Sequence, residues 1–415
     1  MEEAENLYSA LEKACKDGNL INVEHYIDQL KTLTKKHPKL NNLYLKAIVI
    51  ATETFQGKFS SIKLKEFMKS ARKLVTENPL DQNLQDNYAI ILRASLSAMS
   101  TKGQPILMQD IIKNLDELTA KNPTNVVISE QLSYASREIA YYWKNRGDFK
   151  AVKDRTRKFR ELAKKFPDNE KIKLNLSKAL TLEIDSSNKY DIKNIDQILT
   201  EIQQISESTP ANVGLQLEWI HAYRTALDRS YEKPEDTTKW LDSMKKIVAN
   251  QKEDLFKVEL AKGYLNAIAT TGKENPEETL TRLNELKVIA DKTKNNIELQ
   301  LLFAQSLLES LKVIGIADKI KTDEILNELK RLNNDFPAEA AIKEVYVESL
   351  IGVIGLYSQA KKGEEINKLL DQFQKLVEKY KDDPLMSQIG EELKKSLTFL
   401  GYKKEKTKKV KQDYT

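Results

Sequence analysis

A proline-containing junction recurs along the chain and constrains its fold more than any other feature. It occurs seven times, as Lys36-His37-Pro38, Glu77-Asn78-Pro79, Lys121-Asn122-Pro123, Lys165-Phe166-Pro167, Ser208-Thr209-Pro210, Asp335-Phe336-Pro337 and Asp382-Asp383-Pro384. The 127 residues between Pro210 and Pro337 leave room for two more units, whose junctions we place at Gln251 and Lys292. Successive anchors are then separated by 41, 44, 44, 43, 41, 41, 45 and 47 residues. The chain is therefore expected to be a repeat array with a unit of about 43 residues.

Apolar and small residues recur at fixed distances after each anchor. Offset five gives Leu43, Leu84, Ile128, Ile172, Leu215, Phe256, Ile297, Ile342 and Ile389. Offset nine gives Ala47, Tyr88, Leu132, Leu176, Trp219, Leu260, Leu301, Tyr346 and Leu393, and offset twelve is mostly small, as in Ala135, Ala179, Ala222, Gly263, Ala304, Ser349 and Ser396. These offsets fall on one face of an α-helix. A helix, which we call A, is therefore predicted after each anchor, with a small residue where a neighbouring helix approaches closely.

A second helix, which we call B, is predicted before each anchor. Apolar residues often lie eight and five residues before the anchor, as in Leu30/Leu33, Ala71/Leu74, Leu115/Leu118, Phe159/Leu162, Ile202/Ile205 and Leu329/Leu332. Pro ends helix B and can occupy the first turn of the next helix A, where no N–H is needed. Breakers such as Gly18-Asn19, Gly57, Gly103-Gln104-Pro105, Gly147-Asp148 and Gly363 mark the turn from A to B.

Stacking of these hairpins follows from their amphipathic pattern, because no single hairpin can bury its apolar stripe alone. The predicted fold is all-α, a right-handed α-solenoid of about nine helical hairpins with a C-terminal capping helix around residues 385–400. Residues 1–401 are predicted to form a single array. Residues 402–415 lack apolar periodicity and are predicted to be a basic, disordered tail.

The junctions resemble those of tetratricopeptide repeats. The residues that carry the resemblance are Gly147-Asp148, Ala151 and Ala163-Lys164-Lys165-Phe166-Pro167-Asp168-Asn169, with a similar set at Gly363-Glu364-Glu365, Lys379-Tyr380 and Pro384. The unit here is longer than the family's repeat of about 34 residues, and its small residue comes later in helix A. Armadillo and HEAT repeats are closer in length, but the junction proline favours the tetratricopeptide-like interpretation.

Composition and charge bear on the class of protein and on its location in the cell. The chain is 40% hydrophobic and 31% charged, which suits a folded core. Its start, Met1-Glu2-Glu3-Ala4, is unlike a signal peptide, and no apolar run is long enough to span a membrane. Cys15 is the single cysteine, so an intramolecular disulfide is excluded and a cytoplasmic location is expected. Most of the net charge of +5 lies in residues 402–415.

Catalytic and metal-binding patterns were sought and none was found. His25, His37 and His221 lie in different units, and no phosphate-binding loop, dinucleotide fingerprint or nucleophile elbow occurs. We therefore expect no cofactor, no metal and no enzymatic activity, while an enzyme whose site leaves no sequence motif stays open. Cys15 is expected to be a small apolar residue of the first helix.

Two surfaces are candidate binding sites. Residues 144–165 are strongly basic, and Lys150, Lys153, Arg157, Arg160 and Lys164 form one stripe of a B helix. This stripe fits phosphate backbone or an acidic partner segment. It also fits a solvated face that acidic neighbours neutralise.

The second surface is implied by the resemblance, since A helices line the concave groove of tetratricopeptide-like stacks. Carried onto this chain, that role falls on Asn87, Tyr134, Lys178, His221 and Lys262. Such side chains can hydrogen-bond an extended peptide, or they can be ordinary positions between core and solvent.

The function predicted from the sequence is a non-catalytic scaffold for protein–protein interaction. Its partner is expected to be a protein or peptide held on the concave face or at the ends, and no membrane partner is expected. A nucleic-acid-associated protein that uses the basic stripe and the lysine-rich tail is the alternative, and an unrecognised enzyme is a third.

Overall fold

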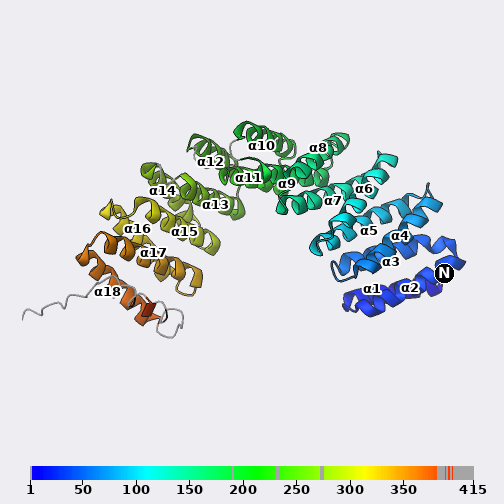
Figure 1. Ribbon diagram of the computed structural model, residues 1–415, viewed down its shortest axis with the longest axis horizontal. Helices are drawn as coiled ribbons and strands as arrows, with labels where there is room; N and C mark the ends of the chain where they lie inside the picture. Colours follow the sequence, from blue (N-terminus) through cyan, green and yellow to red (C-terminus); the bar gives the residue numbers. More distant parts are fainter. Residues whose placement is uncertain are drawn as a thin grey trace, which may run out of the picture. The chain divides into compact units, whose positions relative to one another are not determined.

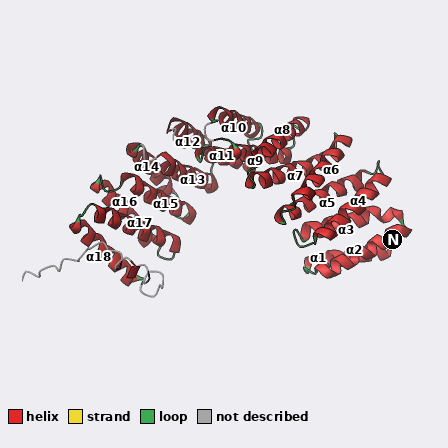
Figure 2. Ribbon diagram, in the orientation of Figure 1, coloured by secondary structure: helices red, strands yellow, loops and turns green. Residues whose placement is uncertain are grey.

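The computed structural model of the chain describes residues 2–188, 191–229, 234–271 and 275–380, with residues 388, 391, 392 and 395 beyond them. Within these residues every regular element is helical and no strand occurs (Figure 2). Eighteen α-helices and the short 3-10 helix η1 (Pro38–Leu40) follow one another along the chain. The predicted all-α class and the nine A–B pairs are confirmed. The predicted capping helix falls almost entirely outside the described residues, and the predicted tail lies wholly outside them.

Odd-numbered helices are the predicted A helices and even-numbered ones the predicted B helices. The A helices are α1 (Glu2–Lys16), α3 (Asn41–Thr54), α5 (Gln82–Thr101), α7 (Val126–Asn145), α9 (Glu170–Ser186), α11 (Val213–Leu227), α13 (Asp254–Thr271), α15 (Ile297–Ile314) and α17 (Ala340–Gln359). The B helices are α2 (Leu20–Lys36), α4 (Ser61–Glu77), α6 (Pro105–Lys121), α8 (Phe149–Lys165), α10 (Ile192–Glu207), α12 (Pro234–Val248), α14 (Pro276–Lys292), α16 (Lys319–Asp335) and α18 (Gly363–Lys379).

The chain divides into two compact units, Met1–Thr225 and Ala226–Thr415. In the first unit each A helix packs against the next, from α1 through α3, α5 and α7 to α9, and each of α2, α4, α6 and α8 packs against the A helix before it. Figure 1 shows α8 and α10 on one side of α7, α9 and α11. In the second unit α13, α15 and α17 pack in the same sequential way, with α14 and α16 against them. The single array from 1 to 401 stays a prediction.

The core of both units is the apolar stripe that the sequence pattern predicts. Offset five is fully buried in Leu84, Ile128, Ile172, Leu215, Phe256 and Ile342, and offset twelve in Ala135, Ala179, Ala222 and Ser349. Gly263 shows why this second position is small. A Cβ atom there would lie 2.8 Å from the sulfur of the buried Met244.

The predicted register is wrong at two junctions. After Pro38 it is shifted by one residue, since Leu43 is only half-buried and Tyr44 is buried. The larger shift is at the junction placed at Lys292. Ile297, five residues on, is 46% exposed, whereas Leu299 is fully buried. Asn296 caps α15 by accepting a hydrogen bond from the Leu299 N–H at 3.1 Å. The anchor therefore lies at Lys294. No proline marks this junction, and interpolation by length misplaced it by two residues.

The junction prolines that the structure describes stand before helix A and not in its first turn, and Pro38 lies in η1. Pro384 lies outside the described residues. At Phe166-Pro167-Asp168-Asn169 the Asn169 N–H donates to the Phe166 carbonyl at 3.1 Å, which closes a four-residue turn with Pro second. The same turn precedes α5, α7, α11 and α17. Proline suits that place because its fixed φ matches the second residue of a type I turn.

Asparagine caps tie neighbouring A helices together in the first unit. The Asn125 side chain accepts from the Ile128 N–H at 3.0 Å and donates to Asp86 of α5 at 2.7 Å. Asn169 does the same one hairpin later, accepting from Ile172 and donating to Glu130 of α7 at 2.9 Å. Each cap therefore starts one helix and fixes its start against the previous one.

Candidate functional site

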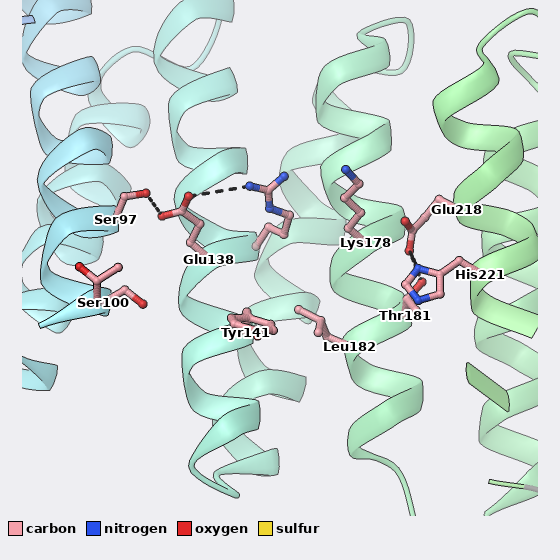
Figure 3. Close-up of a pocket in the computed structure, with 11 residues that line it drawn as sticks. Ser97, Ser100, Glu138, Tyr141, Lys178, Thr181, Leu182, Glu218 and His221 are labelled. Atoms are coloured by element: carbon pink, nitrogen blue, oxygen red, sulfur yellow. Dashed lines mark hydrogen bonds and ion pairs between the residues drawn. The ribbon is translucent and has the colours of Figure 1, made fainter. Parts of the chain in front are cut away.

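A groove on the A-helix face of the first unit is the candidate functional site. It has a volume of about 670 Å³ and is lined by α5, α7, α9 and α11 (Figure 3). The lining side chains are Ser97, Ser100, Thr101, Arg137, Glu138, Tyr141, Lys178, Thr181, Leu182, Glu218 and His221. Four consecutive A helices thus contribute to one surface. The site exists only because the hairpins stack.

One end of the groove is fixed by a carboxylate bound from two sides. The Ser97 hydroxyl of α5 donates to Glu138 of α7, and the Arg137 guanidinium lies 3.8 Å from the other carboxylate oxygen. Arg137 also donates to the Asn175 side chain of α9 at 3.1 Å. These contacts hold both charged groups in place before any ligand arrives.

A second carboxylate, Glu218 of α11, lies at the opposite end and is almost fully buried. It accepts a hydrogen bond from the Thr181 hydroxyl of α9 at 2.6 Å. The Nδ1 atom of His221 lies 3.6 Å from the same oxygen (Figure 3). Thr181 therefore donates to the carboxylate and not to the imidazole. This order differs from a catalytic triad, in which the base contacts the nucleophile.

The middle of the groove carries the groups that are available to a ligand. Lys178 of α9 is half-buried and has no hydrogen bond or ion pair to another residue in the described part of the chain. Tyr141 is 55% exposed, and Figure 3 shows its ring beside Leu182 of the next helix. The arrangement is an apolar shelf next to an uncompensated cation.

The predicted groove residues are distributed unevenly. Lys178 and His221 line the groove. Asn87 is buried, and Tyr134 lies under the Arg137 guanidinium with 5.8 Å between the charge and the ring centre. Lys262 belongs to the second unit and pairs with Glu259 and Glu298, both at 3.0 Å. That any of these residues binds a ligand stays a prediction.

Sequence reasoning missed several lining residues, including Ser97, Glu138, Tyr141 and Leu182. They lie fifteen or eighteen residues after their anchors, one or two helical turns beyond the offsets considered. Continuing the same helix face in steps of three and four residues would have found them.

The basic stripe of α8 is only partly available. Lys150, Lys153, Arg157 and Lys164 are exposed. Arg160 is half-buried between Glu183 of α9 at 3.2 Å and Glu201 of α10 at 2.9 Å. Arg157 lies 3.6 Å from Asp154, and Lys164 pairs with Glu161 at 2.8 Å. Lys150 and Lys153 are left with no ion pair to a described residue.

Burial shapes the ionisation of one carboxyl beneath this stripe. Glu183 is almost fully buried, and desolvation raises its pKa above the usual range although Arg160 opposes the shift. The Arg160 charge is therefore committed to compensating a buried acid, which makes it a poor contact for an incoming phosphate.

The described residues hold neither a candidate metal cluster nor a candidate membrane span. They contain no cluster of three or more His, Cys, Asp or Glu side chains arranged to hold a metal ion. They also contain no helix with the length and apolar character needed to cross a membrane. Cys15 is buried and free, as expected of an apolar helix residue.

Comparisons with known proteins identify no family for this chain. No family model matches the sequence, and no curated protein matches it. Among solved structures, the crystal structure of yeast Tom70 is similar at 12% identity over 96% of each chain, with a TM-score of 0.19. A TM-score this low does not establish a shared arrangement of helices, so the fold class rests on the helices themselves.

Proposed function

We propose that this protein is a non-catalytic interaction scaffold that binds an extended peptide segment of a protein partner in the groove of the first unit. The single observation that carries the proposal is the unpaired Lys178 beside the shelf of Tyr141 and Leu182. A peptide that places an acidic side chain on the lysine and an apolar one on the shelf would satisfy both. We place the protein in the cytoplasm, which fits its single cysteine.

The geometry supports a peptide better than a compact small molecule. The lining spans four helices, and neighbouring packed helices are about 8–10 Å apart. An elongated ligand can reach both ends of such a groove. The hydroxyls of Ser100 and Thr101 can serve as hydrogen-bond partners for a peptide backbone.

The absence of a nucleophile–base contact supports a binding role. Thr181, Glu218 and His221 are the lining residues most similar to a catalytic set, and the threonine is bonded to the acid. Glu138 is bonded by Ser97 and lies near Arg137. Both acids therefore act as fixed anchors of the groove wall.

Nucleic-acid binding by the α8 stripe is the weaker candidate. Only Lys150 and Lys153 are exposed without an ion pair to a described residue, whereas Arg160 is committed to two glutamates. Retention on RNA or DNA at low salt that disappears on changing Lys150 and Lys153 to Gln would favour it.

A displayed library of random peptides tests the groove. We expect selection on the wild-type protein to enrich peptides that combine an acidic with an aromatic or aliphatic residue. Lys178→Glu should weaken a selected peptide at least about tenfold, since a charge-assisted hydrogen bond contributes about 1.5–3 kcal/mol. Lys158→Glu, at an exposed position of α8, is the matched control and should bind as the wild type does. Equal binding by the Lys178 variant would remove the groove from the proposal.

A further inference from the structure

An unusual row of apolar side chains occupies one edge of the first unit. Ile21, Ile62 and Ile106 are the second residues of α2, α4 and α6, and Phe149 is the first residue of α8. They are 81%, 80%, 75% and 50% exposed. Single exposed apolar residues are ordinary, but four at the same place in consecutive hairpins are a repeated feature. We call these four residues the turn strip.

Contacts between turns make this edge continuous. The Gln104 amide, just before α6, donates to the Ser61 hydroxyl of α4 at 2.8 Å, and the Lys102 ammonium donates to the Phe59 carbonyl. A Cβ atom built on Gly103 would lie 3.6 Å from the Arg146 guanidinium of the next turn. The turns before α4, α6 and α8 are therefore neighbours, and Ile62, Ile106 and Phe149 project from one connected surface.

Positive charge accompanies the strip. Lys16, Lys58, Lys102 and Arg146 each lie within two residues of the left-handed glycine of an A–B turn. None of α2, α4, α6 and α8 has an acidic residue in its first turn, although acids are favoured there by the helix dipole. Asp17 and Asp148 are the acids of these turns. Asp17 offsets the charge of Lys16, and the Asp148 carboxylate already accepts the Ala151 N–H at 3.0 Å, so the excess positive charge comes from Lys58 and Lys102.

The second unit shows that this pattern is not required by the fold. Three of its B helices begin with acidic pairs, Glu235 and Asp236 in α12, Glu277 and Glu278 in α14, and Glu364 and Glu365 in α18. The fourth, α16, carries an exposed isoleucine, Ile320, at its second position. The run of apolar residues at consecutive hairpins is thus a property of the first four hairpins, and α10, which has Lys193 at its second position, does not continue it.

We propose that the turn strip is a peripheral membrane-binding surface that inserts its four apolar side chains into the interface of an anionic lipid bilayer. Successive side chains come from separate B helices, with the polar groups of the turns between them. Discrete projections of this kind suit a fluid interface, where each side chain inserts separately, while cations meet the lipid phosphates. A protein partner would instead need a continuous complementary patch. The sequence alone led us to expect no membrane partner, and this proposal departs from that expectation.

Vesicle co-sedimentation of the full chain tests the proposal. The wild type should sediment with vesicles of phosphatidylcholine containing phosphatidylserine, and less with phosphatidylcholine alone. Burying part of an isoleucine multiplies a partition coefficient about fivefold, so changing Ile21, Ile62 and Ile106 together to Gln should lower it about a hundredfold. Ile320→Gln is the matched control, with the same helix position and similar exposure, and should bind as the wild type does.

Loss of vesicle binding by the triple variant must be distinguished from binding through the tail, from unfolding and from self-association. The lysines between residues 403 and 411 are present in every variant, so a loss of binding in the triple variant is assigned to the strip. Circular dichroism should show that the triple variant melts as the wild type does, because all three side chains are exposed. No sedimentation of the wild type with anionic vesicles, or equal sedimentation of the triple variant, would overturn the proposal. So would concentration-dependent self-association that the triple variant abolishes without vesicle binding, since the strip would then join two copies of the chain.

Discussion

Arg155 of α8 offers the sharpest test of how the stack is held together. It is 5% exposed, and its guanidinium donates to both carboxylate oxygens of Asp116 of α6 at 2.8 and 2.9 Å. It also donates twice to the Ser136 hydroxyl of α7, at 3.0 and 2.6 Å. One side chain thus connects three helices. Replacing Arg155 with Ala removes these bonds and leaves a cavity where its aliphatic stem lay.

The magnitude follows from the partners that remain. Removing one member of a fully buried ion pair costs about 3–5 kcal/mol, but the Asp116 side chain is 34% exposed and can regain water. Ser136 keeps its own bond to the Leu132 carbonyl at 2.6 Å. Including the cavity, we expect Arg155→Ala to lower the free energy of unfolding by about 3 kcal/mol. Arg155→Met fills the space with apolar atoms and should cost about 1 kcal/mol.

The methionine expectation has support within the chain. Twelve residues before the anchor, four of the nine B helices carry a buried apolar residue, namely Phe67 in α4, Ile111 in α6, Ile198 in α10 and Ile325 in α16. Counted from Lys294, α14 carries a second buried arginine there, Arg282. Arg155 therefore occupies a position that an apolar side chain fills in four other hairpins of the same chain.

Urea unfolding followed by circular dichroism gives the comparison, and hydrogen exchange in α6, α7 and α8 shows where protection is lost, since hairpins of a stack can open separately. Arg157→Ala, whose side chain is 73% exposed, is the control and should change stability by less than about 0.5 kcal/mol. If methionine cost as much as alanine, the charge and not the volume would decide the position, and the reasoning would be wrong.

Two further predictions concern the second unit. Gly263→Ala should lower the free energy of unfolding by about 1–3 kcal/mol, because its Cβ would lie 2.8 Å from buried Met244. Gly352→Ala, whose Cβ would have nothing within 4 Å, should raise the free energy of unfolding by up to about 1 kcal/mol. Thermal or urea unfolding of both variants checks this pair of predictions. Burial alone would raise the pKa of Glu328, but hydrogen bonds from Arg331 and Lys287 outweigh it and lower the pKa. The ionised Glu328 therefore stabilises the fold above the ordinary glutamate pKa and loses that effect as pH falls through the lowered value. Glu328→Gln should cost about 1 kcal/mol near neutral pH, and this cost should shrink as the pH falls below the ordinary glutamate pKa; a cost that does not change with pH in acid would contradict this.

The hairpins could be predicted because junction and core signals coincide. Pro123 and Pro167 each stand two residues before an asparagine cap, and Ile128 and Ile172 are buried three residues after that cap. Where proline is missing, at Lys292, spacing alone gave the right number of hairpins but the wrong register. Asn296 followed by Leu299 carried the correct signal in the sequence. A mean repeat length gives only an approximate start for each helix A, whereas a capping residue identifies the start of one particular helix.

The groove could be predicted only in part, since its depth depends on how neighbouring A helices are rotated about their axes. With about 100° per residue, offset eight lies about 65° from the centre of the core stripe and offset eleven about 125°. Asn175, at offset eight, is accordingly buried, where it donates to Ser133 of α7 at 3.0 Å and accepts from Arg137. Lys178, three residues on, reaches the groove. A helical wheel shows the direction of each side chain but not how far the buried face extends around the helix. It could therefore not predict that Asn175 is buried while Lys178 reaches the groove. Substituting Asn175 would therefore report on the packing of α7 against α9, and substituting Lys178 on the binding of a ligand.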